Sequence, residues 1–189
     1  MRRRVVLALA CALPLAACTS SPNPSYFTIS TMPGTPGGRA PARIALRRIE
    51  VAEYLDRNSI VRARVGTEVQ IAGSDLWAEP LGSMLNRVLA EELTQRLPGS
   101  TVYSTTGAIT AAPLATVEIN VQRLDADASG LVHLLAQVAI ERGDGHAPLA
   151  TRTFDFTARP TGPGPGQLVA AMSDAVAQLA DTVAKLLRR

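Results

Sequence analysis

The fold follows from one stretch of the chain, LVHLLAQVAIERGDGHAPLATRTFDFTA, at residues 131–158. Segments 131–142 and 149–158 are rich in apolar and β-branched residues, which is typical of strands. Gly143-Asp144-Gly145 lies between them and is a strong turn signal. The stretch therefore predicts an antiparallel hairpin, and further elements can be placed outward from it.

Other strand-like segments lie on the N-terminal side of this hairpin. We expect extended structure at 25–30, at 43–71 with Gly66 as a turn point, at 101–104 and at 115–124. The adjacent Arg47 and Arg48 interrupt the alternation and predict a bulge. Residues 31–41 contain three prolines and three glycines, so they predict a surface loop without chemistry of its own.

Two segments have a helical period instead. Residues 76–97 repeat apolar side chains every three or four positions, with Pro80 in the first turn. Residues 167–187 form a second amphipathic pattern after the break TGPGPG. Strands in clusters with two separated helices predict an α+β fold, a mixed, largely antiparallel sheet with two amphipathic helices packed on one face.

Composition excludes several classes of protein. The chain has 189 residues, 47% hydrophobic and 19% charged, which suits one globular domain. Its net charge of +3 comes from Arg2, Arg3 and Arg4, and the rest of the chain has 16 basic and 16 acidic residues. A neutral domain with 4% aromatic residues lacks the field and the stacking surface that bind nucleic acid, so we expect no nucleic-acid partner.

The N-terminus has the form of a secretory signal. Residues 1–4 are positively charged, and the apolar run 5–15 has about half the length of a membrane-spanning helix. Leu15-Ala16-Ala17-Cys18 then resembles the bacterial lipobox, in which cleavage precedes a lipidated cysteine. The alternative is a plain signal peptide with an incidental cysteine.

These features predict how the chain is organised. We expect a signal peptide at 1–17, cleavage between Ala17 and Cys18, a lipidated tether at 18–24 and one domain at 25–189. Cys18 is then the only cysteine left, which excludes an intramolecular disulfide. The covalent lipid on Cys18 anchors the protein to a membrane, and no cofactor is expected. Thr19 is not the Asp that resembles an inner-membrane retention signal, which favours the outer membrane.

Catalytic and metal-binding motifs are missing from the sequence. His133 and His146 have no cysteine to share a metal with, and we expect His133 to face solvent or a hydrogen-bond partner. The pair Glu91 and Glu92 is expected on a solvated side of its helix, and Asp125 with Asp127 in a turn. We assign no catalytic residue and no metal ligand, and expect the protein not to be an enzyme.

Two motifs between residues 52 and 81 are distinctive. Tyr54-Leu55-Asp56-Arg57 follows a predicted strand, and Leu76-Trp77-Ala78-Glu79-Pro80-Leu81 opens the first predicted helix. Trp77, the only tryptophan, is either a hydrophobic staple under the helix start or an anchor for a protein partner. Asp56 and Arg57 are either part of such a contact or an ordinary surface pair.

With the lipobox and Tyr26-Phe27-Thr28-Ile29 near the mature start, these two motifs resemble those of the ABC-type transport auxiliary lipoproteins, the PqiC/YmbA-like membrane integrity-associated transporter subunits. The resemblance covers nearly the whole mature chain. One departure is visible, since the family often has a proline where this chain has Ala52.

The resemblance implies a non-enzymatic outer-membrane lipoprotein of a transenvelope lipid transport system. Its partners would be MCE-domain transport proteins of the inner membrane. Docking on a symmetric tube of such proteins would favour a homo-oligomeric ring of copies, because symmetric partners are matched most simply by symmetry. The candidate contact or motif residues are Tyr54, Asp56, Arg57, Trp77, Glu79 and Pro80. The alternatives are a periplasmic lipid-binding carrier, with a pocket between sheet and helices, and a periplasmic hydrolase, for which no motif is present.

Overall fold

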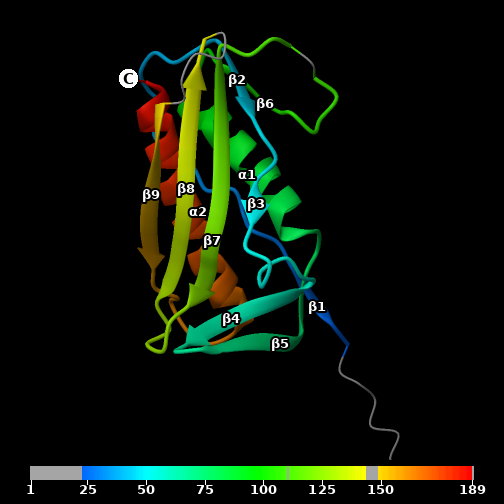
Figure 1. Cartoon of the computed structure of the whole chain (residues 1–189). Helices are drawn as coiled ribbons and strands as arrows, with labels where there is room; N and C mark the ends of the chain where they lie inside the picture. Colours follow the sequence, from blue (N-terminus) through cyan, green and yellow to red (C-terminus); the bar gives the residue numbers. More distant parts are fainter. Residues whose placement is uncertain (1–22, 110, 144–148, 189) are drawn as a thin grey trace, which may run out of the picture.

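The computed structural model describes residues 23–109, 111–143 and 149–188. Its elements are β1 (Ser25–Phe27), β2 (Arg43–Leu46), β3 (Glu50–Val51), β4 (Ser59–Val65), β5 (Glu68–Trp77), α1 (Leu81–Arg96), β6 (Thr101–Ser104), β7 (Ala115–Ala126), β8 (Val132–Arg142), β9 (Leu149–Ala158) and α2 (Pro165–Leu187). Nine strands form one mixed sheet and both helices pack on one of its faces, which confirms the predicted α+β class (Figure 1).

Strand β7 is the axis of the sheet. One of its edges pairs with β8 in antiparallel register along its whole length, and β8 pairs with β9, so the predicted hairpin is confirmed. The other edge of β7 pairs in turn with β2, β3 and β4, all in parallel. The hairpin β4–β5 crosses the lower end of the molecule, with β1 beside it (Figure 1).

The interruption predicted at Arg47 and Arg48 divides one extended segment into two strands. β2 ends at Leu46 and β3 begins at Glu50, yet both pair with β7. The Arg47 N–H still donates to the Val117 carbonyl at 3.0 Å, so the ladder continues across the gap.

The core lies between the sheet and the two helices. Alternate residues of β8 are buried from Val132 to Ile140, and the apolar stripe of α2 packs against them. Helix α1 begins at Leu81, five residues later than predicted, because Leu76 and Trp77 continue β5 and pair with β1. Pro80 is therefore the N-cap residue of α1 and not part of its first turn.

Residues 28–40, which we call the strap, connect β1 to β2 and contain no helix or strand. The side chain of Ile29 is buried in the core, and the Ser30 N–H donates to Ser173 Oγ of α2 at 3.0 Å. The first strand, predicted at 25–30, therefore ends at Phe27, and the residues that follow are tied to the helix layer. Residues 31–40 form a loop without helix or strand, as predicted. Neither α1 nor α2, the helices of the described ranges, is long and apolar enough to cross a membrane.

Candidate functional site

The first distinctive motif, Tyr54 to Arg57, is a tight turn after β3. The Leu55 N–H donates to the Ala52 carbonyl at 2.8 Å, and the Leu55 side chain is buried. Arg57 Nε donates to the Tyr54 carbonyl at 2.7 Å, which holds the arginine along the turn. Asp56 and Arg57 are both exposed, and no ion pair of the described residues joins them.

Tyr54 fixes this turn to the sheet. Its hydroxyl donates to Asp125 Oδ2 at 2.7 Å, and Arg123 Nε donates to Asp125 Oδ1 at 2.8 Å. Asp125 lies within strand β7 and is fully buried, so the expectation that it belongs to a turn is wrong. Burial, together with the hydrogen bond to this carboxylate, raises the pKa of Tyr54 well above its ordinary value. Tyr54 is therefore a permanent hydrogen-bond donor.

Asp127, two residues later, does have the predicted turn role. Its Oδ1 accepts hydrogen bonds from the backbone N–H and the hydroxyl of Ser129 and from the Leu131 N–H. These bonds, that of the Ser129 hydroxyl first, hold the pKa of the carboxyl well below its usual range. The ring of His133 lies between Asp127 and Asp155, with nitrogen–oxygen distances of 3.2 and 3.3 Å. Of the two predicted surroundings for His133, solvent or a hydrogen-bond partner, the structure shows hydrogen-bond partners.

Metal binding has no support in this cluster. Among the described residues, no group of three or more His, Cys, Asp and Glu is arranged to hold an ion. His146, the other histidine of the sequence, lies outside the described residues, as do Cys11, Ala17 and Cys18.

The second distinctive motif forms the junction of β1, β5 and α1. Trp77 is 6% exposed and belongs to the core, and its backbone N–H donates to the Asn58 carbonyl at 2.7 Å. Glu79 Oε1 forms an ion pair with Arg87 Nη2 at 2.6 Å. The next residue, Pro80, is the N-cap of α1. The burial of Trp77 matches the interpretation that it packs under the helix start, and not that it anchors a partner. A partner can contact only those residues of the two motifs that are exposed.

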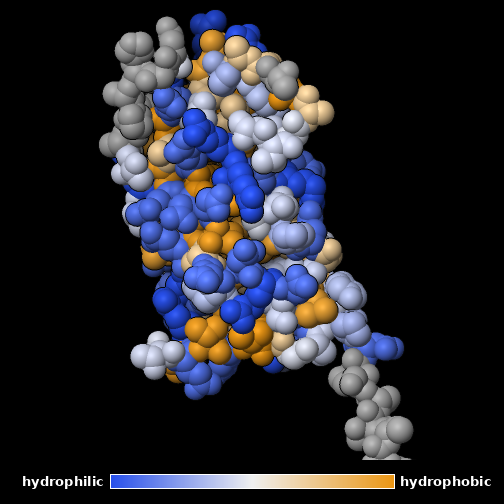
Figure 2. Space-filling model, turned by 45° about the vertical axis from the view of Figure 1, so that its right-hand side comes forward, coloured by the Kyte–Doolittle hydropathy of each residue, from blue (hydrophilic) through white to orange (hydrophobic). Residues whose placement is uncertain are grey.

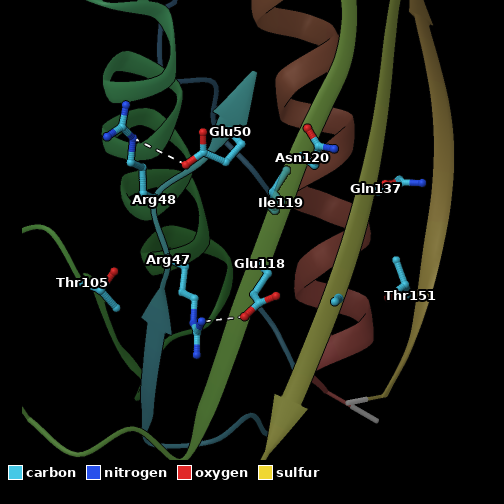
Figure 3. A pocket seen from close by; sticks show the side chains of 10 residues that line it. Arg47, Arg48, Glu50, Thr105, Glu118, Ile119, Asn120, Gln137 and Thr151 are labelled. Atoms are coloured by element: carbon cyan, nitrogen blue, oxygen red, sulfur yellow. Dashed lines mark ion pairs between the residues drawn. The ribbon is translucent and has the colours of Figure 1, made fainter. Parts of the chain in front are cut away.

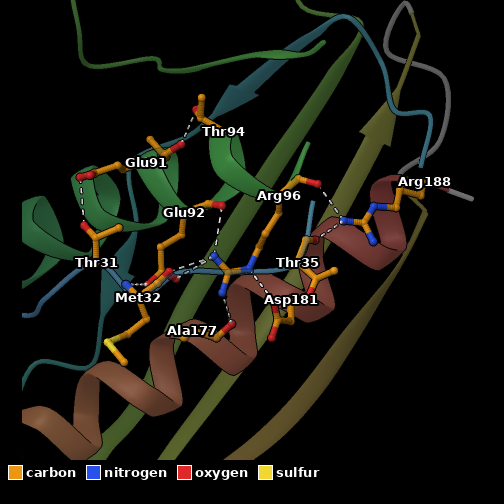
Figure 4. A network of polar contacts seen from close by, with 11 residues as sticks. Thr31, Met32, Thr35, Glu91, Glu92, Thr94, Arg96, Ala177, Asp181 and Arg188 are labelled. Atoms are coloured by element: carbon orange, nitrogen blue, oxygen red, sulfur yellow. Dashed lines mark hydrogen bonds and ion pairs between the residues drawn. The ribbon is translucent and has the colours of Figure 1, made fainter. Parts of the chain in front are cut away.

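A second buried carboxylate lies on α1. Glu92 is 0% exposed, its Oε1 accepts the Met32 N–H of the strap at 2.7 Å, and its Oε2 lies 3.9 Å from Arg96 Nη1 (Figure 4). Burial raises the pKa of Glu92 to about 6. The prediction that Glu91 and Glu92 share a solvated side is correct for Glu91, which bonds to Thr31, and wrong for Glu92.

Arg96 is the centre of this network. Its guanidinium is 1% exposed and contacts Asp181, the Met32 carbonyl and the Ala177 carbonyl, so it joins α1, the strap and α2 (Figure 4). A Cβ on Gly34 would lie 2.2 Å from Arg96 Cζ, which shows how closely the strap backbone passes. The contacts of Arg96 therefore hold the strap against both helices, and we call this network the clamp.

An open groove crosses the sheet face opposite the helices. Its volume is about 730 Å³, and charged and polar side chains predominate along it (Figure 3). Arg47 pairs with Glu118 at 3.1 Å and Arg48 with Glu50 at 3.7 Å, and all four side chains are largely exposed.

Sequence reasoning missed the buried ionic pair on α1, although a signal was present. Glu92 and Arg96 occupy positions of the helical stripe that also contains Leu85, Val88 and Leu89. Opposite charges four residues apart within an apolar stripe indicate a paired, buried position.

Comparisons with known proteins test the resemblance. A family model described as "ABC-type transport auxiliary lipoprotein component" matches residues 27–184. The chain belongs to the ABC-type transport auxiliary lipoprotein family. The resemblance stated from the motifs is thus confirmed, and the family itself indicates a transport-associated lipoprotein of the cell envelope.

Solved structures similar to this auxiliary lipoprotein agree with the fold. An uncharacterized protein has a TM-score of 0.73 at 21% identity, with 87% of this chain and 98% of that chain covered. Protein XCC0632 from Xanthomonas campestris, of family DUF330, has a TM-score of 0.72 at 17% identity, with 86% and 94% covered. Hypothetical protein CT253 from Chlamydia trachomatis has a TM-score of 0.52 at 5% identity, with 79% and 96% covered. The comparison with curated proteins gave no match.

Proposed function

We propose that this protein is an outer-membrane lipoprotein of a transenvelope lipid transport system, where it docks an inner-membrane-anchored complex of MCE-domain proteins. The observation that carries the proposal is the family match over residues 27–184. The protein supports membrane integrity by holding the conduit at the membrane and performs no catalysis.

The anchor in this proposal is a lipid on Cys18. The sequence Leu15-Ala16-Ala17-Cys18 supports it, and a multiply acylated cysteine anchors a domain stably without a spanning helix. The domain would then lie close to the membrane, because few residues separate Cys18 from Ser25.

The surface offered to the partner includes the exposed residues of the first motif, Asp56 and Arg57. They lie on a turn that is held rigidly, since Tyr54 bonds to the buried Asp125. A rigid, exposed pair gives a partner a fixed polar contact at little entropic cost.

The deciding experiment is crosslinking of the intact protein in living cells, followed by membrane fractionation and identification of what is captured. Recovery of an MCE-domain protein with outer-membrane material is the expected result. The Arg57→Ala variant should reduce this capture several-fold, whereas Arg39→Ala, an exposed arginine of the strap, should leave it unchanged. Recovery of lipid alone would contradict the docking role.

A second experiment tests the anchor. Cys18→Ser should release the protein from membranes and weaken the envelope, while Cys11→Ser, within the signal peptide, should have no effect. A Cys18→Ser protein that remains on membranes and supports the envelope fully would overturn the proposal.

No observation favours the alternative function, a periplasmic lipid-binding carrier. Within the described ranges, one continuous cluster of apolar side chains fills the space between sheet and helices. Native mass spectrometry of the purified protein tests this point, and we expect no co-purified lipid other than the anchor.

A further inference from the structure

Exposed apolar side chains lie along the lower end of the molecule, which is formed by β1 and the β4–β5 hairpin (Figure 1). Three of the five large exposed apolar side chains of the described residues are Tyr26 on β1, Val65 on β4 and Ile71 on β5, at 65%, 39% and 44% exposure. These three strands are hydrogen-bonded neighbours in the order β1-β5-β4. Figure 2 shows apolar side chains at this lower end, close to the start of β1.

The other two exposed apolar side chains lie away from this end. Ile109 and Leu114 belong to the segment between β6 and β7, at the opposite, upper end in Figure 1. Leu114 is 43% exposed, so it matches Ile71 closely in exposure. Leu114 therefore serves as an equally exposed control for Ile71 at the other end of the molecule.

The chain that leads to the lipidated cysteine enters at the lower end. Four residues separate Cys18 from Asn23, the first described residue, and a fully extended chain over these five Cα–Cα steps reaches about 17 Å. β1 pairs with Asp75 to Trp77 of β5, and β5 pairs otherwise with β4 alone among the described strands. The outer edge of β5 at residues 68–74 therefore faces away from the sheet, on the tether side.

The charge of the β4–β5 hairpin is balanced. It contains Arg62 and Arg64 against Glu68 and Asp75. Such a surface is neither attracted to anionic lipids nor repelled by them, so any contact with lipid depends on apolar side chains, with the arginine stems extending along the surface.

We propose that the β4–β5 hairpin, with Tyr26 of β1, lies against the lipid surface that holds the protein's own anchor, with the side chains of Tyr26, Val65 and Ile71 at the headgroup level. The contact rests on the lipid anchor of the proposed function. It fixes the orientation of the domain, with the β2–β6 end and Leu114 directed away from the membrane.

The test uses the full lipoprotein, processed in a Gram-negative host and reconstituted into vesicles of phosphatidylethanolamine and phosphatidylglycerol. Cys18 is the only cysteine of the mature chain and is blocked by its lipid, so Ile71→Cys provides a single thiol for bimane. Leu114→Cys is the matched control. Quenching is measured with aqueous iodide and with brominated lipid, in vesicles and in detergent.

On vesicles, bimane at position 71 should be at least about threefold less accessible to iodide than in detergent, and brominated lipid should quench it. Bimane at position 114 should show neither change. The shielding at position 71 should be the same at low and high salt, because the hairpin carries no net charge.

Three outcomes would overturn the proposal. Position 71 could stay open to iodide on vesicles, position 114 could be shielded equally, or position 71 could be shielded in detergent too, as expected for a contact between copies. Failure of the anchor is distinguishable, because an unlipidated protein would not float with the vesicles and its Cys18 would react with bimane.

Discussion

Glu92 and Asp125 are both carboxylates with no solvent exposure, but their surroundings differ. Asp125 lies on the sheet, and each of its oxygens accepts a hydrogen bond, one from Tyr54 and one from Arg123. Glu92 lies on a helix, one oxygen accepts the Met32 N–H, and the other has no hydrogen-bond partner. Burial raises the pKa of Glu92 to about 6.

The difference shows what each carboxylate does. Asp125 is fully satisfied and fixes the Tyr54 turn in one position, which suits a rigid contact surface. Glu92 is held by the strap and by Arg96, so its environment depends on how the strap is seated between the helices. The cluster of Asp125, Tyr54 and Arg123 is thus a fixed scaffold. The protonation of Glu92, in contrast, depends on the position of the strap.

The largest effect is expected from Arg96→Ala. Removing the guanidinium leaves Glu92 buried without its counter-charge and removes the bond to the Met32 carbonyl of the strap, so the free energy of unfolding should fall by about 3 kcal/mol. Urea unfolding measures it. Arg87→Ala, which breaks the exposed pair with Glu79, is the control and should cost less than about 1 kcal/mol. An equal decrease in the free energy of unfolding of the two variants would show that the buried pair stabilises the fold no more than the exposed pair does.

Tyr54→Phe tests the sheet-side cluster. The variant keeps the ring but removes the donor to the buried Asp125, so the free energy of unfolding should fall by about 2 kcal/mol. Tyr26→Phe is the matched control, because that hydroxyl belongs to a largely exposed side chain, and it should change stability by less than about 0.5 kcal/mol. If both variants unfold at the same urea concentration, the hydrogen bond from Tyr54 to Asp125 does not stabilise the fold.

Hydrophobic period and turn signals were sufficient to predict the class of the fold. The β8–β9 hairpin was predicted because its partners are adjacent in sequence and a glycine turn joins them. The start of α1 was misplaced because Leu76 and Trp77 owe their strand structure to β1, some fifty residues away, a pairing that local period does not contain.

The candidate site was predicted only in part, for a related reason. The sequence indicated that Tyr54 and Arg57 matter, but not that Tyr54 bonds to Asp125, because that contact spans 71 residues. Glu92 was placed on a solvated side of its helix and Asp125 in a turn, because charged side chains are rarely fully buried unless they are paired. Met32 and Tyr54 reach these carboxylates only through the tertiary fold, whereas Arg123 is two residues from Asp125 on β7 and Arg96 is one helical turn from Glu92.

Gly34→Ala measures how closely the strap approaches the clamp. The added Cβ would lie 2.2 Å from Arg96 Cζ, so the strap or the guanidinium must move, at an expected cost of about 1–2 kcal/mol. Gly37→Ala is the matched control, because Gly37 lies in the same strap and its Cβ would meet nothing within 4 Å. A Gly37→Ala loss as large as that of Gly34→Ala would indicate backbone stiffness and not the contact with Arg96.

The smallest effect is expected in the pH dependence of Glu92→Gln. The folded pKa of Glu92, about 6, exceeds its ordinary value of 4.5, so the folded protein holds this proton more tightly than the unfolded chain. The stability that this proton contributes is complete below pH 4.5 and lost as pH rises through 6. The glutamine variant lacks this component, so its stability relative to the native protein should increase with pH over this window. Glu91→Gln, on the exposed neighbour, should follow the native curve, and parallel curves for all three proteins would show that Glu92 keeps an ordinary pKa in spite of its burial.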